Sequence, residues 1–137
     1  EVDRDDLHDF MQLRIDIFVV EQNCPYPEID GKDRKSIHLF ARNEGGKMVA
    51  YIRILPAHVS YEEVSIGRVV VDQSCRGTGL GYELMQRGMD WIDENWGKQP
   101  IRIGAQEHLE VFYGNLGFVR ASEPYLEDGI PHIEMTC

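Results

Sequence analysis

The chain has 137 residues, of which 42% are hydrophobic and 28% are charged, which predicts one globular domain over 1–137. Its 24 acidic and 14 basic residues give a net charge of -10, which argues against a nucleic-acid partner because Lys and Arg neutralise phosphates. The absence of a long apolar run and the charged opening Glu-Val-Asp-Arg-Asp-Asp argue against a membrane span or an export signal, so we expect a cytoplasmic protein with no membrane partner.

The first half of the chain predicts one helix and three strands. Apolar residues at helical spacing indicate an amphipathic helix from Asp5 to about Val20. The next segment, 21–36, is polar and is interrupted by Pro25, Pro27 and Gly31, so we expect a loop. Apolar, β-branched runs then predict strands at 37–42, 48–55 and 64–71, the first two joined by a hairpin turn.

The second half alternates helices and strands. Apolar residues on one face of 80–96, followed by Gly97, predict a helix with a defined end. Strand 101–105 is short and apolar, and a right-handed crossover would place it parallel to the preceding strand. A shorter helix is expected at 107–116, and strands at 118–121 and 131–135. This order predicts an α+β (α/β mixed) fold in which helices flank a central mixed sheet.

The most informative segment is the turn between strand 64–71 and the following helix. Arg76 is followed by glycines at 77, 79 and 81, which leave backbone N–H groups uncovered where the helix begins. The helix dipole adds partial positive charge there, and Arg76 adds a full charge, an arrangement that suits a phosphate or pyrophosphate. The spacing matches neither the Walker A loop nor the dinucleotide fingerprint. From these residues alone, phosphate binding and a turn without a ligand remain open alternatives.

Two motifs resemble the GNAT superfamily of acetyl-CoA-dependent N-acetyltransferases. They are Arg76-Gly77-Thr78-Gly79-Leu80-Gly81 after a strand, and Phe112-Tyr113-Gly114-Asn115-Leu116-Gly117-Phe118 further along the chain. Segments 18–26, 28–31 and 125–132 look like the ElaA-type branch of that superfamily. The resemblance implies a GNAT acyl-CoA N-acyltransferase fold, in which a mostly antiparallel sheet contains a splayed pair of parallel strands.

The same resemblance implies acetyl-CoA (coenzyme A) as the cofactor and suggests its contacts. Pantetheine would pair with the main chain of 69–71, and the pyrophosphate would rest on the N–H groups of the glycine loop. Gln106 stands where many relatives carry an Asn that touches the cofactor. The implied cofactor-binding residues are Val69, Val70, Val71, Arg76, Gly77, Thr78, Gly79, Leu80, Gly81, Gln106 and Tyr113.

The implied reaction is direct transfer of acetyl to an amine within a ternary complex. Tyr113 matches the tyrosine that many GNAT enzymes place near the sulfur of coenzyme A as general acid. A backbone N–H near Val70 is the implied donor to the carbonyl oxygen. The alternative for Tyr113 is a core tyrosine whose hydroxyl is bonded elsewhere.

The residues that bind the amine and remove its proton are left open by the sequence. Arg53 and Arg68 lie on neighbouring strands and suit an acceptor that carries a carboxylate, or they pair with acidic residues across the sheet. The acidic loops indicate a small-molecule amine or a peptide amine as acceptor. A water chain could serve as the base; the side-chain candidates are Glu21, Asp30, Glu107, Glu127, His38 and His132.

Other functions also remain open at this stage. A non-catalytic acyl-CoA-binding or sensing module would bind coenzyme A without turnover, and a nucleotide-phosphate enzyme would need a Walker lysine that this loop lacks. The three widely spaced cysteines predict neither a disulfide framework nor a metal site. GNAT domains usually open with a strand before the first helix, and none is apparent here. We therefore expect the uncovered sheet edge to be able to accept a partner chain, as in a homodimer.

Overall fold

The computed structural model describes residues 1–24 and 26–137; Pro25, one of the expected loop breakers, lies outside the described residues. The chain begins with α1 (Arg4–Arg14), which is capped by the Asp3 carboxylate because this group accepts a 2.8 Å hydrogen bond from the Asp6 N–H. The helix continues directly as a π-helix over Ile15–Glu21. The expected N-terminal helix is therefore confirmed, although its last part is wound more widely than an α-helix.

The first sheet consists of three antiparallel strands in the order β1, β2, β3. β2 is central and buried along its whole length. The outer edge of β1 pairs with no other strand in the described part of the chain, so the homodimer expected from an uncovered edge stays a prediction. The bounds are β1 (Ile37–Arg42), β2 (Met48–Leu55) and β3 (Ser65–Val71), as expected from the sequence to within one residue.

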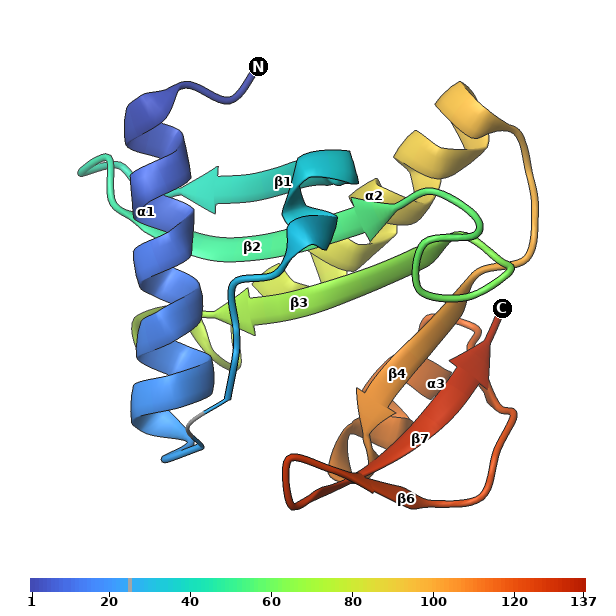
Figure 1. The fold of residues 1–137 in the computed structure, drawn as a ribbon. Helices are drawn as coiled ribbons and strands as arrows, with labels where there is room; N and C mark the ends of the chain where they lie inside the picture. The colour runs from blue at the N-terminus through green and yellow to red at the C-terminus, as the bar shows by residue number, and fades with distance from the viewer. Residues whose placement is uncertain (25) are drawn as a thin grey trace.

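Helices cover both faces of this sheet (Figure 1). Because side chains alternate along β2, Ile52 packs with α2 (Leu80–Trp96) while Tyr51 packs with Phe10 of α1. Gly88 of α2 permits close packing, since a Cβ there would lie 2.6 Å from Cδ1 of Ile52. Across the residues that the structure describes, no helix combines the length and apolar character of a membrane span.

A second sheet is built from the C-terminal third of the chain, in the order β4, β7, β5, with β6 also paired to β7. α3 (Glu110–Gly114) follows a 3-10 turn at Glu107–Leu109, in place of the single helix expected at 107–116. β6 was not expected from the sequence; it forms a hairpin with the start of β7. The strands are β4 (Arg102–Gln106), β5 (Val119–Arg120), β6 (Tyr125–Glu127) and β7 (Ile130–Thr136).

The two sheets meet where β3 and β4 begin. Val64 and Ile101 form a parallel bridge, and the Arg102 N–H donates a hydrogen bond to the Val64 carbonyl at 2.9 Å. No other β3–β4 pair occurs among the described residues. The two strands run in the same direction and diverge (Figure 1), which confirms the expected splayed parallel pair within a mostly antiparallel α+β fold.

Candidate active site

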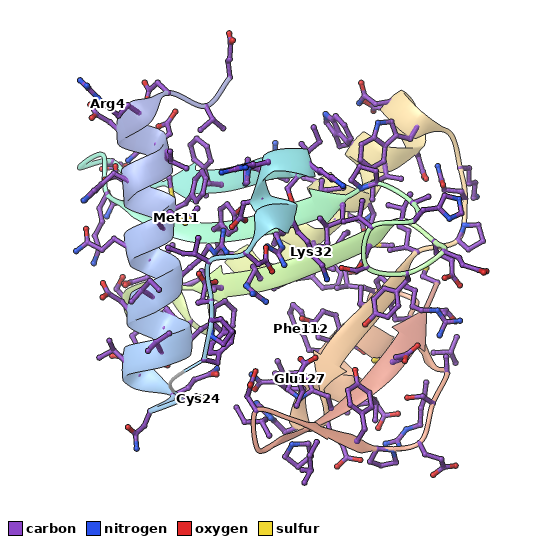
Figure 2. All side chains as sticks on the ribbon, viewed as in Figure 1. Arg4, Met11, Cys24, Lys32, Phe112 and Glu127 are labelled. Carbon is purple, nitrogen blue, oxygen red and sulfur yellow. The ribbon has the colours of Figure 1, made fainter. Side chains whose placement is uncertain are left out.

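A cavity of about 760 Å³ opens where β3 and β4 separate. Its walls come from β3, the glycine loop, the start of α2, the helical segment around α3, the β6–β7 hairpin and the end of the N-terminal helix. Figure 2 shows Phe112 and Glu127 on the side of the second sheet, with Cys24 near the end of the N-terminal helix. The cavity is large enough for an extended small molecule that enters between the two sheets.

The inner edge of β3 is bonded to β2. The Asp72 N–H donates to the Val49 carbonyl at 2.7 Å, just beyond the end of β3. Hydrogen-bonded pairs in an antiparallel ladder recur at every second residue, so the pair Tyr51–Val70 is hydrogen-bonded as well. The N–H of Val70 is therefore directed at β2 and away from the cavity.

The outer edge of β3 is presented to the cavity instead. Successive N–H groups of a strand point to opposite sides, which leaves those of Val69 and Val71 on the edge that faces β4. Val70 still lines the cavity, but its N–H, the expected backbone donor, does not face the cavity, whereas the N–H of its neighbour Val69 does. Arg68 and Val69 form a bulge, and Arg68 has a φ of +51°, a strained value for a non-glycine residue.

The glycine loop begins α2 with its first turn uncapped. Gly79 is the N-cap residue, and no side chain in the described chain caps the N–H groups that follow. Gly77 and Gly79 have φ values of +80° and +85°, which other residues adopt only with strain. Gly81 has a different role from the one expected, because a Cβ there would lie 3.2 Å from Cγ2 of Val71 and would press α2 away from β3.

Arg76 lies at the mouth of the cavity and is already engaged. Its Nη1 lies 2.8 Å from a carboxylate oxygen of Glu21, and its Nε donates to the Val71 carbonyl at 3.1 Å. The hydrogen bond from Arg76 lowers the pKa of Glu21 below its usual range. Thr78 points elsewhere: it is absent from the cavity wall, and its hydroxyl donates to the Cys75 carbonyl at 2.6 Å.

Tyr113 lies in the wall on the α3 side. The residue is 6% exposed, and burial raises the pKa of its phenol to about 12. Its hydroxyl forms no hydrogen bond with any described residue, so the described residues offer no partner for a core tyrosine bonded elsewhere. A phenol that stays protonated and borders the cavity is suited to donate a proton there.

Two of the residues expected at the acceptor lie outside the cavity. His38 is bonded through Nδ1 to the Tyr51 hydroxyl and through Nε2 to the Asp33 carbonyl, under α1. Arg53 is 4% exposed and donates to Asp30 at 2.8 Å and to Asp33 at 3.1 Å. Arg53 therefore follows the alternative of pairing with acidic residues, because the loop 26–36 folds back onto the sheet.

The remaining acceptor candidates do line the cavity. Arg68 does so, but its Nε lies 2.8 Å from the Glu28 carboxylate, which neutralises its charge. Glu127 borders the cavity with its side chain 61% exposed. Gln106 also lines it, and its Nε2 donates to the Gln22 side chain at 3.3 Å. These contacts place carboxylates, amides and one neutralised arginine at the acceptor end.

A buried cluster of charged residues supports the acceptor end of the cavity wall from outside. The sequence did not predict this cluster. Its centre is Arg14, which is fully buried and donates to Glu28 at 2.8 Å and to Asp33 at 2.7 Å. The only available signal was a lone arginine on the apolar face of the first helix. The cluster consists of Arg14, Glu28, Asp30, Asp33, Arg53 and Arg68.

Comparison with known proteins identifies the architecture around this cavity. The acetyltransferase (GNAT) domain family matches residues 9–137, and protein ElaA of Escherichia coli strain K12 is 44% identical over 132 residues, or 94% of this chain and 85% of ElaA. The chain belongs to the GNAT acetyltransferases. Acyltransferases of this family use acetyl-CoA as acyl donor.

Solved structures of GNAT proteins agree with this assignment. An acyl-CoA N-acyltransferase from Pseudomonas aeruginosa is 42% identical with a TM-score of 0.92, covering 99% of this chain and 92% of that one. The crystal structure of Escherichia coli ElaA is 41% identical with a TM-score of 0.91 and the same coverage, 99% and 92%. The ElaA-like branch expected from the motifs is thereby confirmed.

Proposed function

We propose that this GNAT protein transfers acetyl from acetyl-CoA directly to an amine within a ternary complex. The observation that carries the proposal is the divergence of β3 from β4 beyond a single described bridge, which leaves one strand edge open beside an uncapped helix start. Both features border one cavity, so one extended ligand can contact them together.

The residues present fit coenzyme A. The uncapped N–H groups at the start of α2, together with Arg76, suit a pyrophosphate, and the open edge at Val69 and Val71 suits the amide groups of pantetheine. Acetyl-CoA supplies an activated thioester when bound. The Val69 N–H would stabilise charge that develops on the carbonyl oxygen, and the Tyr113 hydroxyl would protonate the departing sulfur.

The charges at the acceptor end favour a cationic acceptor. Glu127 and Asp128 lie in the wall of the cavity, and the one arginine there, Arg68, is neutralised by Glu28. The chain as a whole carries a net charge of -10, which attracts cations. A small-molecule amine or a peptide amine fits this surface better than an acceptor that needs an unpaired arginine.

The test is an acceptor screen that follows thiol release from acetyl-CoA, with pools of amino acids, polyamines, aminoglycosides and peptide N-termini. At least one pool should accelerate thiol release. Tyr113→Phe should slow that reaction by about 10²-fold or more and leave the affinity for coenzyme A nearly unchanged, because only the hydroxyl group that donates the proton is removed. Binding of coenzyme A with no thiol release in any pool would support the acyl-CoA-binding module instead.

A further inference from the structure

The structure reduces the candidate general bases to two side chains. Glu21 lies with Arg76 beside the glycine loop, at the end of the cavity assigned to the pyrophosphate, and Asp30 accepts hydrogen bonds from Arg53 through both of its oxygens. Neither carboxylate is therefore placed to take a proton from the acceptor amine. Glu107 lies outside the cavity wall, as does His38. The candidates that remain in the wall are Glu127 and His132, which lie side by side.

His132 is oriented by its own strand. Its Nδ1 lies 2.7 Å from the Ile130 carbonyl oxygen, which can only accept, so Nδ1 carries the hydrogen. In the neutral ring, Nε2 then carries the lone pair, and it lies 3.5 Å from a carboxylate oxygen of Glu127. The ring also stacks on Tyr125 at 6.0 Å between centroids. His108, the other imidazole in the wall, is exposed, and no described residue bonds to its ring.

We infer that His132 is the general base that removes a proton from the acceptor amine, an inference that rests on the proposed acetyl transfer. Imidazole is the better class of base for an ammonium group, since its reference pKa of ~6.5 lies about two units above that of a Glu carboxylate. Glu127 faces the same nitrogen and stabilises the imidazolium ion once it forms.

The strand alternation places the base and the acid on opposite faces of the second sheet. Ile133 and Met135 of β7 pack in the core with Tyr113, so His132 projects from the other face. His132 is paired with Gln106 of β4, whose side chain reaches Gln22 of the N-terminal segment. His132 therefore acts on the amine and Tyr113 on the leaving thiol, from opposite faces of the second sheet at the same opening of the cavity.

The proton balance follows from this arrangement. The ammonium group gives one proton to Nε2 of His132, and the neutral nitrogen forms a bond to the thioester carbonyl carbon as the carbon–sulfur bond breaks. Tyr113 gives its proton to the leaving thiolate. The second proton lost from nitrogen replaces the one that Tyr113 gave. His132 then releases the first proton to water, so an ammonium ion and a thioester yield an amide, a thiol and one free proton.

The test compares two probe acceptors of similar size, ethylamine and 2,2,2-trifluoroethylamine. Ethylamine is protonated at pH 7, whereas the fluorinated amine is largely neutral and needs no base before attack. His132→Gln should lower kcat/KM for ethylamine by about 10²-fold or more and leave kcat/KM for the fluorinated amine near the wild-type value. Added imidazole should restore part of the ethylamine activity of His132→Ala. His8→Gln, which removes an exposed imidazole on α1, is the control and should leave both rates unchanged.

A merely structural histidine would slow both amines equally, and that result would overturn the inference. If the wild-type protein acetylates neither probe, the acceptor screen still decides the proposed function, and the protonation of the His132 ring decides the inference. Nitrogen-15 shifts of His132 in the complex with coenzyme A should then show the Nδ1–H tautomer. An Nε2–H tautomer would overturn the inference, because that nitrogen would have no lone pair for a proton.

Discussion

Two groups of arginine–carboxylate pairs lie beside the cavity, and they differ in burial and in the number of partners. Arg14 is fully buried and bonds to two carboxylates and a backbone carbonyl, whereas Arg76 has a side chain that is 42% exposed and pairs with Glu21. A buried arginine cannot exchange its partners for a ligand without leaving carboxylates uncompensated. An exposed arginine at a cavity mouth can do so at small cost.

The comparison therefore assigns the first group to stability and the second to ligand binding. The largest expected effect comes from Arg14→Met, which removes the fully buried cation that Glu28 and Asp33 share. It should lower the free energy of unfolding by about 3–5 kcal/mol, measured by urea denaturation. The matched control is Arg42→Met, because Arg42 also pairs with two carboxylates but lies on the surface. This variant should lose much less free energy of unfolding. Equal losses in the two variants would break the comparison.

The opposite behaviour is expected at the cavity mouth. Arg76→Gln should leave the free energy of unfolding nearly unchanged but weaken coenzyme A binding by about 10- to 100-fold, the value of a charge-assisted hydrogen bond. Calorimetric titration with coenzyme A and with pantetheine, which lacks the pyrophosphate, measures the effect. Pantetheine should bind the variant as it binds the wild type; equal weakening of both ligands would refute the assignment of this loop.

Several features of this comparison could be predicted from the sequence, and others could not. The glycine loop and Arg76 are contiguous in the chain, so their local geometry follows from residue types. Arg53 and His38 were wrongly expected at the site, because the pattern of a strand does not show that the loop 26–36 folds back over these side chains. β6 was missed because three residues, Tyr125–Glu127, are too few to show alternation. The break between the two sheets arises from tertiary packing rather than from any local pattern.

Lowering the pH should reduce the stability that the buried cluster contributes. Burial alone would raise the pKa of Asp33, but the hydrogen bonds from Arg14 and Arg53 hold it below its ordinary value. The folded state therefore binds this proton less readily than the unfolded state, and the resulting stability is present above pH ~3.9 and is lost as the pH falls below it. Urea denaturation between pH 7 and pH 3 should show this loss, and Asp33→Asn should show a smaller dependence. An unchanged dependence in Asp33→Asn would contradict the role of the cluster.

The smallest effect is expected from the partner of Arg76. Glu21→Gln keeps the size of the side chain but removes the charge that competes for Arg76. Coenzyme A should bind this variant about two- to fivefold more tightly, as expected for an exposed ion pair. Gln73→Ala, which removes only the amide that bonds to Glu21 at 2.8 Å, provides the control and should change the affinity less. Weaker binding by Glu21→Gln would mean that Glu21 orients Arg76 for the ligand.

The central claim is that the outer edge of β3 receives the pantetheine arm. Residue-resolved amide hydrogen exchange, with and without coenzyme A, tests it most directly. Val70 should exchange slowly in both states because its N–H is directed at β2, whereas coenzyme A should slow the exchange of Val69 and Val71. Saturating coenzyme A that leaves Val69 and Val71 exchanging as before would contradict the claim.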